Sequence, residues 1–158
     1  MPRTARFTID NGCYHIITRG NQKQLVFRDL HDYEIYLDIL TKYKRKYKFK
    51  LYCYCLMPNH VHLIIEVSES KILSRIMKGV NQVYTSYFNS KYKKVGHLWQ
   101  DRFLSKVIHR DAYLLDCINY IELNPIRADL VDNITKYSWT SYNRCLNQGK
   151  NILDDPII

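Results

Sequence analysis

His60 and His62 are the residues of this sequence whose type and spacing most directly suggest chemistry. They lie in an apolar, β-branched stretch that predicts two strands, near 49–57 and 60–67, joined by a short turn. Residues two apart on a strand point to the same face, so the two imidazoles can share one metal ion while Val61 faces the core. The alternative is that both histidines are polar residues on a solvated strand face.

Tyr120 and Asn124 form a second candidate pair, on a predicted helix. They are four residues apart and share one helix face, about 100° or more from the apolar stripe of Leu114, Ile118 and Ile121. The alternative is that Tyr120 packs at the core boundary and Asn124 caps the helix. Together with the two imidazoles, the amide oxygen and the phenol would supply a metal site and a nucleophile.

Other residues near the histidines offer competing metal sites. Cys53 and Cys55 lie one strand earlier, so a zinc site of cysteine and histidine is an alternative, although structural zinc sites usually place two to four residues between their cysteines. Glu66 shares the strand face of the histidines by parity and is a candidate ligand or base. Six residues of strand span roughly 17–20 Å, however, which disfavours it.

The charge of the chain predicts a polyanionic partner. It has 24 Lys and Arg against 15 Asp and Glu, a formal net charge of +9, with basic clusters at 42–50 and 91–94. Neutralised phosphates release counterions, which drives the binding of nucleic acid. The 14 tyrosines could stack on unpaired bases, although most fall at helical spacing, which favours core packing. A generally basic soluble protein is the alternative.

The five cysteines have no framework spacing, which indicates free thiols in a reducing cytoplasm rather than a disulfide scaffold. No apolar run approaches membrane-spanning length, and the basic N-terminus lacks the apolar core of a signal peptide. We therefore do not expect a membrane protein or a secreted protein that is held together by disulfides. The chain is expected to form a single domain over 1–158.

The elements that must position these residues follow from periodicity and breakers. Besides the two strands above, we expect a strand over 13–19 and a helix over 29–48. A second helix, with Ser70 as its N-cap, should extend to about Asn89. An edge strand near 103–108 and a helix from Asp111 that stops before Pro125 should follow. The expected buried stripes are Tyr33, Tyr36, Leu40, Tyr43 and Tyr47 on the first helix, and Ile72, Ile76, Val80, Val83 and Tyr87 on the second.

The order β-α-β-β-α-β with an appended helix predicts an α+β, ferredoxin-like (RRM-like) fold. In such a fold an antiparallel sheet carries helices on one face. We expect the other face to be free to present the histidines, with the appended C-terminal helix carrying the tyrosine.

Several blocks of the sequence resemble the single-tyrosine HUH transposases, and in particular the REP-associated tyrosine transposases of bacteria. The blocks cover nearly the whole chain in the order and spacing of the family. They are Met1-Pro2-Arg3-x-Ala5-Arg6, Tyr14-His15-x-x-x-Arg19-Gly20, Tyr54-Cys55-Leu56-Met57-Pro58-Asn59-His60-Val61-His62-Leu63, Gly96-His97-Leu98-Trp99-Gln100-x-Arg102-Phe103, Tyr120-Ile121-x-Leu123-Asn124-Pro125-x-Arg127-Ala128 and Trp139-x-Ser141-Tyr142. One position departs from the family: Asp101 stands where a small residue, usually Gly, is expected.

The resemblance implies a metal-dependent endonuclease acting on single-stranded DNA. His60, His62 and Asn124 would hold Mg²⁺ or Mn²⁺, with zinc also possible. Tyr120 would be the nucleophile that forms a 5′-phosphotyrosine link at hairpin-forming palindromic elements.

The implied DNA contacts are Arg19, Trp99, Gln100 and Arg102, and the basic connection adds Lys93 and Lys94. Trp99 would stack on a base, or instead anchor the core. Arg102 would read a base or phosphate, or instead pair with Asp101.

Two other functions remain open on the sequence alone. One is a non-catalytic nucleic-acid-binding module on the same sheet, with the histidines as surface residues. The other is a metal-dependent nuclease that uses activated water and never attaches to its product. Single-tyrosine transposases work as monomers or as homodimers, and both states are open for this chain.

Overall fold

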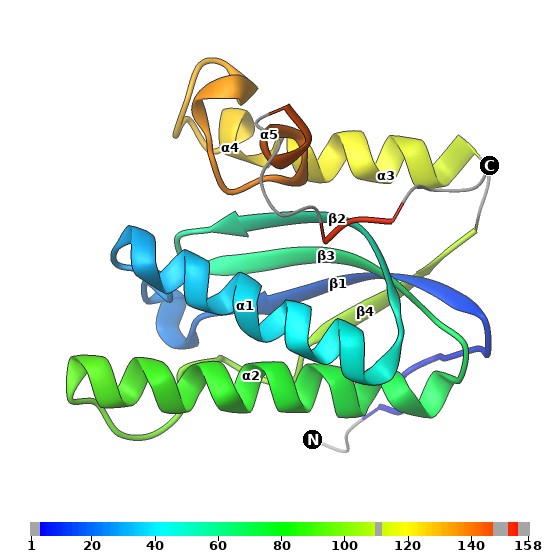
Figure 1. Cartoon of the computed structure of the whole chain (residues 1–158), viewed down its shortest axis with the longest axis horizontal. Helices are drawn as coiled ribbons and strands as arrows, with labels where there is room; N and C mark the ends of the chain where they lie inside the picture. Colours follow the sequence, from blue (N-terminus) through cyan, green and yellow to red (C-terminus); the bar gives the residue numbers. More distant parts are fainter. Residues whose placement is uncertain (1–3, 110–111, 147–151, 155–158) are drawn as a thin grey trace.

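The computed structural model describes residues 4–109, 112–146 and 152–154 (Figure 1). In chain order the elements are β1 (Gly12–Arg19), η1 (Asn21–Lys23), α1 (Leu30–Tyr47), β2 (Lys50–Met57), β3 (His60–Val67), α2 (Ser70–Tyr92), β4 (Leu104–Ile108), α3 (Ala112–Glu122), α4 (Asn124–Arg127), η2 (Ile134–Lys136) and α5 (Ser141–Leu146). The expected helix start at Asp111 and the motif residues Met1, Pro2 and Arg3 lie outside the described residues.

Within the described residues the four strands form one antiparallel sheet in the order β2-β3-β1-β4. This is the predicted ferredoxin-like arrangement. Each of the two β-α-β crossovers joins strands that are not neighbours, since β3 lies between β1 and β2, and β1 lies between β3 and β4. The turn between β2 and β3 consists of Pro58 and Asn59, as expected, and pairs Met57 with His60. The register of β1 on β3 places Arg19 opposite His60 and Ile17 opposite His62.

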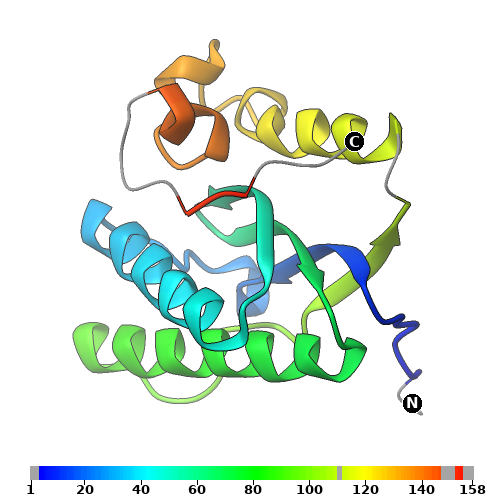
Figure 2. The same ribbon diagram turned by 45° about the vertical axis from the view of Figure 1, so that its right-hand side comes forward.

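Helices α1 and α2 cover one face of the sheet (Figures 1 and 2). The core between them is aromatic, and its largest fully buried side chains are Tyr14, Tyr36, Tyr54, Tyr84 and Phe88. The stripe expected on α1 is confirmed in its first half, whereas Tyr43 and Tyr47 are only partly buried.

The stripe predicted on α2 is confirmed at Ile76 and Val80, which are fully buried, and is wrong at its C-terminal end. Val83 is 43% exposed, and Tyr84 and Phe88 take the buried positions. The helix contains two overlapping apolar stripes, and the one with the larger aromatic rings buries more area. The ends also differ from expectation, since Glu69 rather than Ser70 is the N-cap and the helix continues past Asn89 to Tyr92.

Asp32 joins the start of α1 to the end of α2. Asp29 and Asp32 form a capping box at the N-terminus of α1. The Asp32 carboxylate is fully buried and accepts hydrogen bonds from Tyr87, Tyr92 and the ammonium of Lys91. Lys91 is thereby committed to this network and to Asp29, so the basic run at 91–94 offers fewer free cations than its sequence suggests.

The second face of the sheet is not free, which corrects the sequence expectation. Helix α3 lies across it, seen above the strands in Figure 1, and buries Leu114 and Ile121 against Cys53, Cys55 and Ile64 of β2 and β3. These apolar residues make a second, smaller core. Its cause is visible in β2, which is apolar on both faces and so must be covered on both.

The outer edge of β2 is bonded to two later segments. Leu56 donates its N–H to the carbonyl of Trp139, and Cys55 and Thr140 form an isolated antiparallel β-bridge. At the other end Leu51 accepts from the N–H of Asp154 at 2.8 Å and donates to its carboxylate at 2.9 Å. Among the helices of the described part of the chain, none is long and apolar enough to cross a membrane.

Candidate active site

His60 and His62 lie on β3 with their ring centroids 4.9 Å apart. The same strand face carries both, as predicted, and Val61 is buried on the opposite face. His60 is half-buried, and its Nδ1 lies 2.6 Å from Oδ1 of Asn59. Since that oxygen accepts the proton of Nδ1, the lone pair of His60 is on Nε2, where a metal could bind.

His62 is 5% exposed, so the expectation that both imidazoles face solvent is wrong. The ring of His15 on the neighbouring strand β1 stacks on it. The Nδ1 of His62 lies 2.9 Å from Nε2 of His15, which stands two residues before Ile17 on β1. The three rings of His15, His62 and His60 therefore form one continuous row across β1 and β3.

Burial keeps all three imidazoles neutral. Loss of solvent lowers the pKa of His62 to about 3, and the charges that its neighbours would carry add to the effect. The pKa of His60 falls to about 4 through burial and the nearby Arg19, and that of His15 to about 4 through burial and Lys106. Neutral imidazole is the form that binds metal ions.

Tyr120 projects from the last turns of α3 and is 54% exposed, unlike the buried stripe of the same helix. Helix α3 ends at Glu122, before Pro125 as expected, and the short α4 follows directly. Asn124 is the first residue of α4, and its amide nitrogen donates to the carbonyl of Ile121 at 3.2 Å. This bond uses the nitrogen and so leaves the amide oxygen Oδ1 as the group able to ligate a cation.

Arg127 is a site residue to which sequence reasoning gave no role. Its guanidinium carbon lies 3.8 Å from the centroid of the Tyr120 ring, and its Nη2 donates to the backbone carbonyl of Tyr120. The positive charge of Arg127 is also the last and smallest of the causes that lower the pKa of His62. Arg127 is thus packed directly on the candidate nucleophile. The only signal was its place in the block that follows Tyr120.

The cysteines near the histidines do not suit a zinc site. In the described ranges, no three His, Cys, Asp or Glu side chains are grouped as a metal site. Burial raises the pKa of Cys55 to about 12 and holds that of Cys53 well above its usual value, which opposes the thiolate that zinc requires. The carboxylate of Glu66 accepts a hydrogen bond from Tyr52 at 2.7 Å, at the far end of β3 from His60.

Two hollows, one of them lined by His60, contain three of the six expected DNA contacts. Arg19, Gln100 and Arg102 line one of about 340 Å³, together with Asp101. The second hollow, about 180 Å³, is lined by Arg19, Lys23, Asn59 and His60. Arg19 belongs to both and connects them. Lys23 and Asn59 carried no expected role in DNA binding.

The other expected contacts lie differently. Trp99 is 8% exposed, its ring contacts Tyr36 and Tyr84, and its Nε1 donates to the Asn81 carbonyl at 3.3 Å. This arrangement favours the core-anchor alternative over base stacking. Lys93 and Lys94 are exposed just beyond α2.

The side chain of Asp101 is hydrogen-bonded to the backbone of Arg102 rather than to its side chain. The Asp101 carboxylate accepts from the backbone N–H of Arg102 at 2.7 Å, a bond that does not use the guanidinium.

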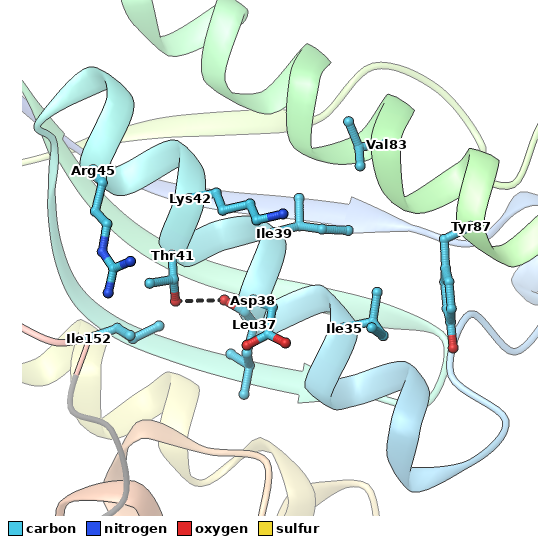
Figure 3. A pocket seen from close by; sticks show the side chains of 10 residues that line it. All are labelled: Ile35, Leu37, Asp38, Ile39, Thr41, Lys42, Arg45, Val83, Tyr87 and Ile152. Carbon is cyan, nitrogen blue, oxygen red and sulfur yellow. Dashed lines mark hydrogen bonds between the residues drawn. The ribbon is translucent and has the colours of Figure 1, made fainter.

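A larger hollow, about 500 Å³, lies elsewhere, between the outer sides of α1 and α2 (Figure 3). Ile35, Ile39 and Val83 line it with Lys42 and Arg45, and none of the three clustered histidines is among its lining residues. It does not belong to the candidate active site.

Comparison with known proteins agrees with this geometry. The family model described as "Transposase IS200 like" matches residues 8–124. A REP-associated tyrosine transposase of Escherichia coli K12 is 21% identical over 152 residues, covering 94% of this chain and 87% of the relative. A candidate REP-associated tyrosine transposase of Haemophilus influenzae is 24% identical over 111 residues, 62% of this chain; the match spans only 61% of that relative.

Two solved structures share the fold. A REP-associated tyrosine transposase bound to a REP hairpin superimposes with a TM-score of 0.77 at 17% identity, covering 100% of this chain and 99% of the other. A candidate transposase of Deinococcus radiodurans gives a TM-score of 0.52 at 19% identity, covering 77% of this chain and 95% of the other. The predicted resemblance is thus confirmed at the level of family and fold.

Proposed function

Because the chain belongs to the IS200-like transposase family, we propose that it cleaves and rejoins single-stranded DNA through a covalent link to Tyr120. The observation that carries the proposal is the pair of neutral imidazoles of His60 and His62, with ring centroids 4.9 Å apart. The chain also has an exposed tyrosine, Tyr120, whose ring is held by the guanidinium of Arg127. Nicking with covalent attachment needs both a metal site and such a nucleophile.

The metal ligands proposed are His60, His62 and Asn124. They would hold Mg²⁺ or Mn²⁺, which when bound neutralises charge on the scissile phosphate and polarises phosphorus toward attack. The imidazoles are neutral because they are buried, and the Asn59 bond turns Nε2 of His60 outward as a ligand atom. The fit rests on ligand chemistry, two nitrogens and one amide oxygen.

In the proposed reaction the Tyr120 oxygen loses its proton and attacks phosphorus. The new bond joins that oxygen to phosphorus, and the bond from phosphorus to the 3′ oxygen breaks; this oxygen takes up a proton as a free 3′-hydroxyl. The product is a 5′-phosphotyrosine link that conserves the bond energy for rejoining. Arg127 packs on the Tyr120 ring and restricts its rotamers.

The proposed substrate is single-stranded DNA that forms hairpins at palindromic elements. The net charge of +9 and the hollow lined by Arg19, Gln100 and Arg102 suit a nucleic-acid strand that passes His60. The structural relative bound to a REP hairpin supports a hairpin rather than an unstructured strand.

The decisive experiment compares Tyr120→Phe with Tyr113→Phe. Both tyrosines are exposed on α3, so the second variant is a matched control. Wild type and Tyr113→Phe should form an adduct with a single-stranded hairpin oligonucleotide that survives denaturing electrophoresis, and only when Mg²⁺ or Mn²⁺ is present. Tyr120→Phe should form none while its DNA affinity stays within about twofold, because only the nucleophilic oxygen is lost.

The other outcomes identify the alternatives. Cleavage without any adduct in wild type would indicate a nuclease that uses activated water. Binding without cleavage would indicate a non-catalytic nucleic-acid-binding module. An adduct that persists in Tyr120→Phe would assign the chemistry to another tyrosine.

A further inference from the structure

His15 contacts the buried histidine directly, yet the proposed reaction leaves it without a task. Its Nε2 lies 2.9 Å from Nδ1 of His62, a hydrogen-bond distance, and the two rings stack with centroids 5.2 Å apart and planes inclined by 24°. His15 is itself half-buried on β1 and is held in place by the pairing of β1 with β3.

A hydrogen bond between two neutral imidazoles has a direction. Each neutral ring has one N–H and one lone pair, so one ring must donate and the other accept. If Nδ1 of His62 donates, the lone pair of His62 is on Nε2. If Nε2 of His15 donates instead, the proton of His62 is on Nε2, and that atom cannot ligate a cation. The direction of this one bond therefore decides whether His62 can act as a ligand.

His60 shows the same arrangement with a different partner. Its Nδ1 faces Oδ1 of Asn59, an atom that can only accept. Both histidines of the pair thus have Nδ1 engaged by a neighbouring side chain, which leaves Nε2 as the remaining ring nitrogen on each. Such partners orient metal-binding histidines and fix their tautomers.

We propose that His15 is a positioning residue that accepts the Nδ1 proton of His62 and so keeps the Nε2 lone pair of His62 available to the divalent cation. The inference rests on the proposed function, because it assigns His62 to the metal site. His15 itself touches neither the cation nor the DNA. A merely structural His15 would contribute its ring to packing and nothing else.

Two substitutions at position 15 separate these roles. His15→Phe keeps a ring of similar size for stacking on His62 but removes the acceptor. His15→Gln loses the ring but can place its amide oxygen near the position of Nε2 and accept the same proton. His31→Phe, at an exposed histidine on α1, is the control. Urea unfolding of each variant verifies that it is folded before it is compared.

The first measurement is calorimetric titration of the metal-free proteins with Mn²⁺. His15→Phe should weaken Mn²⁺ binding by about 10- to 100-fold, whereas His15→Gln should stay within about threefold of wild type. His31→Phe should leave the affinity unchanged. Equal affinity in wild type and His15→Phe would reduce His15 to a packing residue, and equal losses in folded His15→Phe and His15→Gln would also overturn the proposal.

The second measurement needs no metal and no activity. Nitrogen-15 NMR of the imidazole rings distinguishes the two neutral tautomers. Wild type should show His62 protonated at Nδ1, and His15→Phe should shift it toward protonation at Nε2. His62 protonated at Nε2 in wild type would overturn the inference, even if Tyr120 forms the DNA adduct. Failure of wild type to bind Mn²⁺ would instead contradict the proposed function, while the NMR result would still decide the role of His15.

Discussion

Burial determines the protonation state of the three clustered histidines, His15, His60 and His62. His62 is less exposed than its position on a sheet face suggested, and burial is the first cause of the lowered pKa of all three imidazoles. In the unfolded chain the same histidines titrate near 6.5. Between about pH 6.5 and pH 4 the unfolded chain therefore binds more protons than the folded protein.

The metal-free protein should accordingly lose stability on mild acidification. The sign follows from linkage: stability rises with pH wherever the unfolded state holds more protons, so it is full above about pH 6.5 and falls toward pH 4. Urea unfolding at pH 7, 6 and 5 measures the effect before most carboxylates protonate. Exposed His31 serves as the control, since His31→Gln should give the same decline as wild type. A constant unfolding free energy over this range would mean that the three rings are solvated.

At the scale of elements, the network on Asp32 fixes the start of α1 to the end of α2. The carboxylate is fully buried, which by itself raises its pKa, but hydrogen bonds from Tyr92, Lys91, the backbone of Arg28 and Tyr87 together outweigh burial and lower the pKa to about 2. The charged form of Asp32 is thus the one that this packing of α1 on α2 requires.

Asp32→Asn should destabilise the fold by about 2 kcal/mol, because an amide replaces a buried carboxylate that accepts hydrogen bonds from a cation and two phenols. The measurement is the urea midpoint at pH 7. Asp38→Asn is the matched control, as Asp38 is exposed on the same helix, and it should shift the midpoint little. The difference between wild type and Asp32→Asn should disappear as the pH falls from about 4 through about 2, where Asp32 becomes protonated. Equal midpoints at pH 7 would show that the network adds nothing.

The order of the strands and helices could be predicted from the sequence because it depends on local periodicity and breakers. The face of α2 could not, since Val83 and Tyr84 both fit a helical stripe and only the three-dimensional packing decides between them. The His60–His62 pair was visible because it is local in sequence. His15 joins it only through the pairing of β1 with β3, a contact between residues distant in the chain. Arg127 packs on Tyr120 because of the turn after α3, which periodicity does not predict. The burial of His62 likewise depends on three-dimensional packing and was missed.

At the scale of the whole molecule, charge should govern DNA affinity. With a net charge of +9, affinity for single-stranded DNA should fall with salt at a log–log slope of about −0.7 per phosphate contacted. Lys93→Ala or Lys94→Ala should weaken all sequences alike and make the slope shallower by about one contact. Arg102→Ala should weaken a recognised hairpin more than a scrambled one, because its guanidinium lines the hollow beside Arg19. Equal losses on both oligonucleotides would make Arg102 a phosphate contact.

The bonded outer edge of β2 has a consequence for the behaviour of the protein in concentrated solution. A bare edge strand presents unpaired N–H and C=O groups on which another chain can add, and β2 is apolar along nearly its whole length. Asp154 and Trp139 occupy the groups of Leu51 and Leu56 that would otherwise recruit a second molecule.

A chain shortened to residue 151 should therefore aggregate, as measured by light scattering at rising concentration. Asp154→Asn, which keeps the backbone bond to Leu51, should remain dispersed. If the shortened chain also stayed dispersed, the segment at 139–141 would be sufficient by itself to block intermolecular strand addition along β2.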